Sequence, residues 1–282
     1  MLIPGPRPPT PAAPAVNRAS PRRRALLATA LLASALVSGV AGGTPPTAEL
    51  VIFEAASLKD AFARLARQFE AEHPGTKVIT NAAGSQELRA QLEHGASADV
   101  FASADRKHMQ ALVAEGLVQP PALFACNEPV LVVRTALAAT VKTFADLPRV
   151  ERLVLAAPDV PIGAYTAQVL AKAASRYGAD FADRVQARVV SRELNVRQVL
   201  AKVVLGEADA GIVYRSDVAA IPGGKVQVVT IPGELNVTAQ YPIAILKQAP
   251  QPALARQWLA LVTSPAGGAA LREAGFVACS RP

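Results

Sequence analysis

The chain has 282 residues, of which 51% are hydrophobic and only 5% aromatic, and its formal net charge is +7. This length is enough for two medium domains with separate cores, and such a composition favours helices packed on parallel strands. Residues 1–41 contain five arginines and no acidic residue, so subtracting these five from +7 leaves the rest of the chain at only +2. So weak a charge argues against a nucleic-acid or membrane surface as the binding partner.

The N-terminal segment, residues 1–41, has the pattern of an export signal. Three arginines, Arg22-Arg23-Arg24, precede an apolar run over residues 25–40, and small residues up to Ala41 offer a cleavage point. The apolar run is too short to span a bilayer as a helix of the mature protein. The arginines also resemble a twin-arginine signal, so both the Sec and the twin-arginine routes stay open. We therefore expect a soluble periplasmic protein after cleavage near Ala41.

The first unit after the signal is a strand that leads through small residues into a helix. Residues 50–53 form an apolar run typical of a buried strand, and apolar residues from Leu58 to Phe69 recur at helical spacing. Ser57 and Asp60 resemble a capping box, in which the serine oxygen would accept first-turn N–H groups. A strand that feeds a helix N-terminus leaves N–H groups pointing outward, and such positions bind anions. An ordinary N-cap serine is the alternative interpretation.

The same order of elements follows a second time. Residues 77–80 predict a strand, and small residues then lead to Ser85 and a helix. Residues 99–102 predict a third short strand, after which Asp105 is a suitable N-cap for another amphipathic helix. Because a serine follows a strand twice, an anion site at the sheet edge becomes a hypothesis to weigh beside two ordinary caps.

A second series of alternating strands and helices starts near residue 153. Residues 153–156 predict a strand, and a Pro-x-Gly turn around Ile162 opens the next helix. Asn195 is a suitable N-cap for a helix that begins at Val196. Another apolar run predicts a buried strand that ends at Tyr214. The second series therefore repeats the organisation of the first.

Strands that alternate with helices predict an α/β architecture with mostly parallel sheets. Runs near 124–133 and 238–246 join the two series, and helices follow the second run. We therefore expect two lobes, each a mostly parallel sheet flanked by helices, with the terminal helices returning to the first lobe.

Six motifs occur in an order that resembles one protein family. They are Ala55-Ala56-Ser57-Leu58, Gly84-Ser85, Ala98-Asp99-Val100-Phe101-Ala102-Ser103-Ala104-Asp105, Pro161-Ile162-Gly163-Ala164-Tyr165, Asn195-Val196-Arg197 and Gly211-Ile212-Val213-Tyr214-Arg215-Ser216-Asp217. Each motif alone is weak, but together they resemble the periplasmic molybdate-binding proteins of molybdate ABC transporters, which are type II periplasmic solute-binding proteins. The resemblance covers roughly residues 50–280.

The resemblance implies a two-lobed receptor that closes about a two-strand hinge on molybdate or tungstate. Lobe I would comprise residues 48–127 and 240–282, and lobe II residues 128–239. The family holds the oxyanion with hydroxyl and main-chain N–H groups, without a cofactor, a bare metal ion or a charged side chain. Matched motif by motif, the residues that bind the metal oxyanion are Ser57, Ser85, Ile162, Val196 and Tyr214. Ile162 replaces the alanine expected there, which puts only the shape of the cleft in doubt.

The resemblance also implies a monomer that delivers the anion to an ABC permease, is not an enzyme, binds no nucleic acid and does not insert into the membrane. A receptor for another tetrahedral oxyanion, such as sulfate, is the main alternative. Phosphate or ferric iron as ligand, a stand-alone sensor and a different permease also stay open. An enzyme with Ser57 as nucleophile is the alternative of another class, but the chain has no Gly-x-Ser-x-Gly motif.

The other residues with redox or metal-binding chemistry are two cysteines and three histidines. Exported proteins with two cysteines often pair them, but sequence spacing does not show whether Cys126 and Cys279 lie close together. A disulfide and free thiols therefore both stay open. The histidines, His73, His94 and His108, lack the spacing of metal ligands, so we expect them on the solvated surface.

Overall fold

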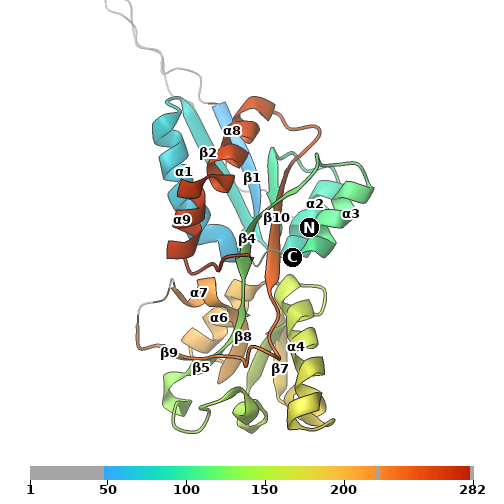
Figure 1. Ribbon diagram of the computed structural model, residues 1–282, viewed down its shortest axis with the longest axis vertical. Coiled ribbons are helices and arrows are strands. Elements are labelled where there is room, and N and C mark those ends of the chain that lie inside the picture. Colours follow the sequence, from blue (N-terminus) through green and yellow to red (C-terminus); the bar gives the residue numbers. More distant parts are fainter. Residues whose placement is uncertain (1–47, 220, 222, 280–282) are drawn as a thin grey trace, which may run out of the picture. The chain divides into compact units, whose positions relative to one another are not determined.

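The computed structural model describes residues 48–219, 221 and 223–279. The export signal predicted for residues 1–41 lies outside the described residues. Within the described part of the chain, no helix combines the length and the apolar character that crossing a bilayer requires. Two five-stranded sheets, each flanked by helices, organise residues 48–279 (Figure 1).

In the first sheet four strands run in one direction and one strand runs against them. In spatial order its strands are β2 (Thr76–Ala83), β1 (Ala48–Ala55), β3 (Val100–Ala102), β10 (Ala239–Ile245) and β4 (Ala122–Asn127). β1 is parallel to β2 and β3, whereas β10 is antiparallel to β3 and β4. The three parallel strands therefore end at the same edge, where Ser57 follows β1 and Ser85 follows β2.

Helices cover both faces of this sheet, and we call the sheet with these helices lobe I. Its helical elements are the 3₁₀ turn η1 (Ala56–Leu58), α1 (Lys59–Glu72), α2 (Ser85–Glu93), α3 (Arg106–Ala114), α8 (Pro252–Thr263) and α9 (Pro265–Glu273). Figure 1 shows α1, α8 and α9 on one side of the sheet and α2 and α3 on the other. The ring of Trp258 packs edge-on against Phe62 and Phe69 of α1, at centroid distances of 5.3 and 5.6 Å. The terminal helices thus return to lobe I, as predicted.

The second sheet also has five strands and is flanked by helices. We call this sheet together with its helices lobe II. Its strands in spatial order are β7 (Val189–Glu193), β6 (Leu153–Ala156), β8 (Ala210–Tyr214), β5 (Pro129–Arg134) and β9 (Val226–Val229). Its helical elements are η2 (Thr135–Leu137), η3 (Phe144–Arg149), α4 (Pro161–Tyr177), α5 (Phe181–Gln186), α6 (Val196–Val204) and α7 (Arg215–Ala219). β6 is parallel to β7 and β8, so the starts of α4 and α6 lie beyond one edge of this sheet.

The chain passes between the two sheets twice, at Glu128 between β4 and β5 and over residues 230–238 between β9 and β10. Both sheets are mixed, but only one strand in each, β10 and β5, runs against the other four, so the sheets are mostly parallel in strand direction, as predicted. The strands next to the two connections, β4, β5, β9 and β10, pair only antiparallel. They enter or leave a sheet directly instead of through a strand–helix–strand crossover, which is the unit that makes parallel pairs.

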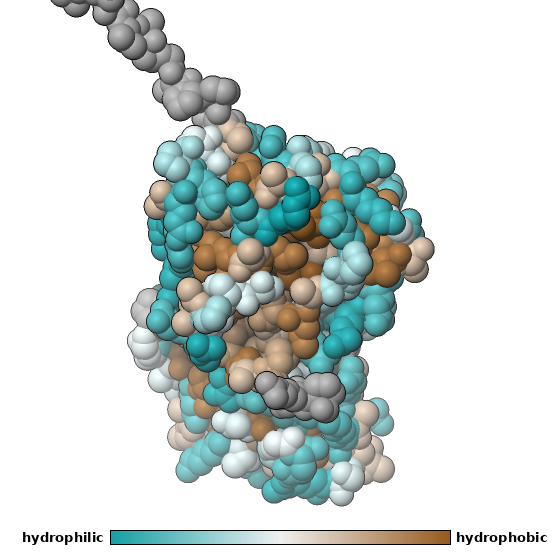
Figure 2. Space-filling model, turned by 45° about the horizontal axis from the view of Figure 1, so that its top comes forward, coloured by the Kyte–Doolittle hydropathy of each residue, from teal (hydrophilic) through white to brown (hydrophobic). Residues whose placement is uncertain are grey.

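The surface is mainly hydrophilic in its outer parts, while apolar residues gather in the middle of the face shown in Figure 2. Three large apolar side chains of lobe II are the most exposed of their kind among the described residues: Val190, Leu194 and Leu205, at 57%, 53% and 72%. Single exposed apolar side chains are common on soluble proteins and need no special explanation.

A disulfide joins Cys126 of β4 to Cys279, with Cα atoms 5.1 Å apart. Val277 also forms an antiparallel bridge with Cys126, so the C-terminal segment lies along the free edge of the first sheet. Of the two possibilities that the sequence left open, the structure has the paired thiols. Both cysteines belong to lobe I, so the link does not join the two lobes directly.

Glu54, near the carboxyl end of β1, is a fully buried carboxyl group. Its burial raises its pKa to about 8, and the Thr80 hydroxyl and the charge of Lys59 oppose this shift only in part. In the folded protein Glu54 therefore holds a proton at neutral pH, where an exposed glutamate has lost it.

The disulfide should contribute measurably to stability, because its cysteines are 153 positions apart in sequence. Replacing Cys279 by Ser should lower the free energy of unfolding by about 2–5 kcal/mol, since the unfolded chain regains the entropy of a large loop. Urea unfolding measures this difference, with the exposed Ala278→Ser as matched control. Thiol titration of the unfolded, unreduced parent should find no free thiol, and two free thiols would contradict the pairing.

The buried Glu54 should make stability fall as pH rises. Below about pH 4.5 the carboxyl is protonated in both the folded and the unfolded state. Between pH 4.5 and 8 the unfolded state loses the proton while the folded state keeps it, so the free energy of unfolding decreases as pH rises. Glu54→Gln removes this decrease, so its advantage over the parent should grow from near zero at acid pH to a few kcal/mol near pH 8. Urea unfolding at several pH values tests this, with the exposed Glu115→Gln as control; parallel curves for parent and Glu54→Gln would refute it.

Candidate functional site

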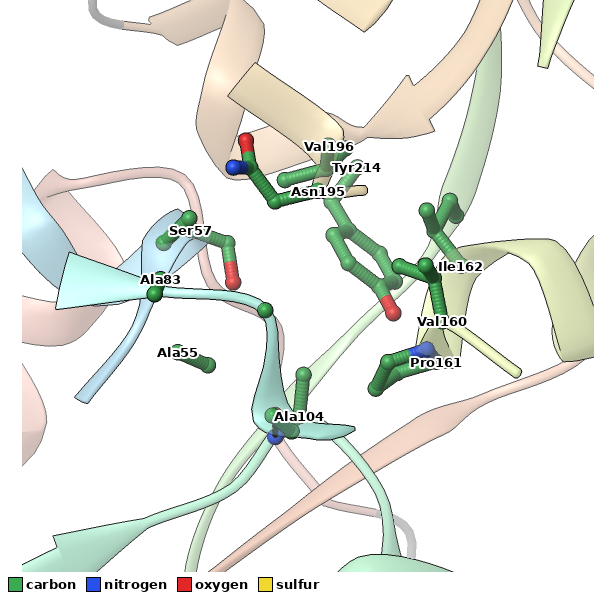
Figure 3. Close-up of a pocket in the computed structure, with 13 residues that line it drawn as sticks. Ala55, Ser57, Ala83, Ala104, Val160, Pro161, Ile162, Asn195, Val196 and Tyr214 are labelled. Atoms are coloured by element: carbon green, nitrogen blue, oxygen red, sulfur yellow. Dashed lines mark hydrogen bonds between the residues drawn. The ribbon is translucent and has the colours of Figure 1, made fainter. Parts of the chain in front are cut away.

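A small cavity lies between the two lobes, next to the starts of several helices (Figure 3). The space inside it that the centre of a water-sized sphere can occupy is about 20 Å³, so the cavity suits a ligand of only a few atoms. The structure brings all five predicted site residues together around it: Ser57, Ser85, Ile162, Val196 and Tyr214. Alanines 55, 83 and 104 also line it, and their small side chains leave hydroxyl and backbone groups close to the cavity.

Ser57 does not cap a helix, so the predicted capping box of Ser57 and Asp60 was wrong. The 3₁₀ turn η1 lies between β1 and α1 and makes Leu58 the N-cap residue, with no side-chain cap. The Ser57 hydroxyl instead forms a hydrogen bond of 2.9 Å with the hydroxyl of Tyr241. Asp60 forms an ion pair with Arg197. Figure 3 shows the Ser57 hydroxyl directed towards the cavity.

Tyr241 is a buried residue of β10 that sequence reasoning missed as part of the site, because it matches an ordinary core position. Its hydroxyl lies 3.5 Å from Asn127 Nδ2, which also donates a 2.7 Å hydrogen bond to Ser216 Oγ. Asn127 Oδ1 accepts the N–H of Glu128, which fixes the orientation of the amide. Tyr241 can therefore accept from Asn127 and donate to Ser57. This leaves the Ser57 proton available to a ligand.

Ser85 is the first residue of α2, and its Oγ accepts a 3.0 Å hydrogen bond from the backbone N–H of Ala104. One acceptor position of the hydroxyl is thus taken, while its proton is available to the cavity. Gly84 precedes it as the N-cap residue. A Cβ at Gly84 would lie 2.5 Å from the carbonyl oxygen of Leu194 in lobe II, so only glycine permits this approach of the lobes.

The start of α4 presents backbone donors to the cavity from lobe II. Pro161 occupies the first position, where its fixed φ and missing N–H suit a helix start. The first-turn N–H of Ile162 has no partner inside the helix. A Cβ at Gly163 would collide with the carbonyl oxygen of Ala157, so the glycine lets the helix start this close to the preceding turn.

The start of α6 presents a second set of backbone donors. Asn195 is its N-cap, as predicted, and the Asn195 side chain accepts the N–H of Gln198 at 3.1 Å. The N–H of Val196, the first residue of α6, has no partner inside the helix. Since α4 and α6 both begin at the cavity, the positive ends of two helix dipoles favour an anion there.

Tyr214 ends β8, and its side chain is fully buried beside the cavity. Figure 3 shows its hydroxyl directed towards the cavity. Among the described residues this hydroxyl has no hydrogen-bond partner. Burial raises its pKa well above the ordinary range of tyrosine, so the hydroxyl keeps its proton and can donate. A buried donor without a partner is costly, and a ligand with an acceptor atom would satisfy it.

The available donors around the cavity are therefore hydroxyl and main-chain N–H groups from both lobes. None of the residues that line it carries a carboxylate, an ammonium or a guanidinium group. The partner of the Ser57 hydroxyl is a tyrosine, not the histidine base that would activate a serine nucleophile. Chemically, the arrangement can hold a small anion by hydrogen bonds.

His108 is fully buried, so the prediction of a solvated surface was wrong for this histidine. Its Nε2 lies 2.9 Å from the carbonyl oxygen of Asp159, in the turn before α4. Lys107 also forms an ion pair of 2.7 Å with the Asp159 carboxylate. These contacts join α3 of lobe I to lobe II. A helical pattern alone does not reveal such a contact, because it depends on how the lobes meet.

The chain matches the family model described as bacterial extracellular solute-binding protein over residues 50–277. It is 39% identical over 264 residues to the molybdate-binding protein ModA of Mycobacterium tuberculosis, with 89% of this chain and 97% of the relative covered. The corresponding protein of Escherichia coli is 33% identical over 224 residues, with 76% of this chain and 84% of the relative covered.

A solved structure, the Azotobacter vinelandii periplasmic molybdate-binding protein, superposes with a TM-score of 0.70 at 24% identity. The alignment covers 82% of this chain and 100% of that chain. This likeness confirms the two-lobed periplasmic-binding-protein fold. The matched family consists of solute-binding proteins. This confirms the prediction that the chain is a binding protein and not an enzyme. The chain belongs to the bacterial extracellular solute-binding protein family, together with its molybdate-binding relatives.

Proposed function

We propose that this protein captures molybdate, and tungstate as well, between its two lobes and delivers it as a monomer to an ABC permease. The single observation that supports this most is the buried Tyr214 hydroxyl, which faces the cavity without a hydrogen-bond partner among the described residues. The names of the relatives identify molybdate as the anion to test first.

The proposal includes the organisation of the chain. Residues 48–127 and 240–282 form lobe I, residues 128–239 form lobe II, and the connections at Glu128 and at 230–238 act as the hinge. Residues 1–41 are an export signal that is removed near Ala41, so the receptor works in the periplasm, where its disulfide persists.

The proposed ligands are the hydroxyls of Ser57, Ser85 and Tyr214 and the backbone N–H groups of Ile162 and Val196. A tetrahedral dianion that leaves water must regain most of its hydrogen bonds, or the burial penalty prevents binding. Hydrogen bonds to a charged group contribute about 1.5–3 kcal/mol each, and a helix N-terminus adds roughly 0.3–1 kcal/mol. Several such donors together can hold the anion in the cavity. Because all of them are neutral, the empty site contains no unpaired cation after the anion is released.

Sulfate is the alternative ligand, because it shares the charge and the tetrahedral shape. Its bonds to oxygen are shorter, so donors placed for a larger anion are left too far away, and hydrogen bonds weaken steeply with distance. Hydrogen phosphate carries a proton that needs an acceptor. The Ala104 N–H occupies one acceptor position of Ser85, and the Tyr241 hydroxyl can occupy one of Ser57, which leaves phosphate little to donate to.

Calorimetric titration with a panel of oxyanions tests the choice of ligand. Molybdate and tungstate should bind tightly, sulfate much more weakly and phosphate hardly at all. Ionic strength is held constant, so that screening does not differ between the anions. If sulfate binds as tightly as molybdate, the proposed preference for molybdate is wrong and the alternative, a receptor for sulfate, is favoured.

Substitution of the site residues tests which groups bind. Ser57→Ala and Ser85→Ala should each weaken molybdate binding by about 1.5–3 kcal/mol, because each removes one donor to a charged group. Tyr214→Phe should cost less, since water can replace its hydroxyl. Val196→Ala is the matched control and should change little, because its N–H remains. If both serine variants bind molybdate like the parent, this assignment of the cleft is wrong.

A further inference from the structure

Arg197 lies in the first turn of α6, directly after the proposed ligand Val196, but it does not line the cavity. Its guanidinium group makes two ion pairs in different directions. Nη2 lies 2.6 Å from Asp60 Oδ2, and Nε lies 2.8 Å from Asp217 Oδ1. The Arg197 side chain is 25% exposed, so solvent screens these pairs less than it screens a pair on the open surface.

The pair with Asp217 lies inside lobe II and reaches a second proposed ligand. Asp217 is fully buried in α7, and its Oδ2 accepts a 3.0 Å hydrogen bond from the backbone N–H of Tyr214. Burial raises the pKa of Asp217 to about 6, while the charge of Arg197 acts in the opposite direction. Arg197 is thus the cation that this buried carboxylate requires, and together they connect the start of α6 to Tyr214.

The pair with Asp60 crosses from lobe II to lobe I. Asp60 lies in the first turn of α1, three residues after Ser57. One arginine therefore connects segments that carry three proposed ligands, Val196 and Tyr214 on one side and Ser57 on the other. The pair with Asp60 exists only while the two lobes are together, whereas both residues of the Asp217 pair belong to the same lobe.

Other polar contacts also cross between the lobes, among them the hydrogen bonds His108–Asp159 and Asn127–Ser216, which carry no paired charges. Two further contacts are the ones to compare with the Arg197–Asp60 pair. Lys107 pairs with Asp159, but both side chains are more than half exposed, at 61% and 57%. Gln86 Nε2 donates to the carbonyl oxygen of Leu194 at 2.7 Å and carries no charge. The Arg197–Asp60 pair is charged, unlike the Gln86 contact, and its side chains are less exposed than those of the Lys107 pair, at 25% and 42%. It is therefore the contact best placed to stabilise the closed form.

We propose that Arg197 is a positioning residue that stabilises the closed, anion-bound form through Asp60 and thereby sets the rate of anion release. This inference rests on the proposed function. The anion itself is held by neutral donors, and Arg197 contributes without touching it. Since Asp60 and Asp217 balance its charge, the guanidinium group stays out of the cavity and does not retain the anion after the lobes open.

Asp60→Asn tests the contact between the lobes, because it keeps the size of the side chain and leaves the Asp217 pair intact. Arg197 keeps its pair with Asp217 in this variant, so the change does not leave a buried charge without a partner. In stopped-flow measurements with molybdate, release should become roughly two- to fivefold faster, while association stays within about twofold. The matched control is Asp180→Asn, which removes an exposed pair with Arg184 inside lobe II and should release molybdate at the parent rate.

Arg197→Lys is the second variant, since it keeps the positive charge near Asp217 but cannot bridge both carboxylates in the same way. This variant should release molybdate at least as fast as Asp60→Asn does. Asp60→Glu keeps the negative charge, so its release rate should lie between those of the parent and Asp60→Asn. The melting temperature of the ligand-free Asp60→Asn protein should match that of the Asp180→Asn control, which separates this role from a purely structural one.

The possible failures are distinguishable. A parent protein that does not bind molybdate would refute the proposed function and this inference with it. A parent that binds molybdate, together with an Asp60→Asn variant that releases it at the parent rate, would refute the role of Arg197 alone. A loss of affinity that lies wholly in the association rate would also overturn the inference.

Discussion

The structure depends on one requirement of hydrogen bonding: a small anion can leave water only where enough donors converge on one point. A single helix start offers too few, because its first-turn N–H groups point in similar directions. The chain meets the requirement by ending parallel strands of two sheets at one place, so that η1 and α2 approach from one lobe and α4 and α6 from the other. The small residues in this region, such as Gly84 and Gly163, follow from the same requirement, since any side chain there would keep these segments apart.

Behind the cavity, neighbouring groups form hydrogen bonds with the hydroxyls of the two site serines. The backbone N–H of Ala104 occupies an acceptor position of Ser85, and the Tyr241 hydroxyl is bonded to Ser57. Asn127 and Tyr241 stand near the two connections between the lobes. Hydrogen bonds in series strengthen one another in a buried setting. The polar contacts of the site thus extend from the cavity to the strands on which the lobes turn.

Much of this could be predicted from the sequence where local pattern decides the outcome. The apolar run at residues 50–53 and the cap at Asn195 are local features, and both agree with the structure. The prediction failed where contacts between distant segments decide. Ser57 fits a cap by its neighbours, but the 3₁₀ turn and Tyr241 give it a different partner. His108 fits an exposed helix face until the other lobe covers it. The antiparallel strands at the connections likewise depend on the return path of the chain, which no window of sequence contains.

The disulfide has a topological consequence. It closes a covalent ring from Cys126 to Cys279, and this ring contains all of lobe II, both connections, β10 and the terminal helices. A protease that cuts one exposed peptide bond anywhere in this ring opens it without releasing a fragment. The nicked molecule remains a single covalent unit until a second cut is made or the disulfide is reduced. A single cleavage in lobe II or in either connection therefore cannot detach lobe II from lobe I.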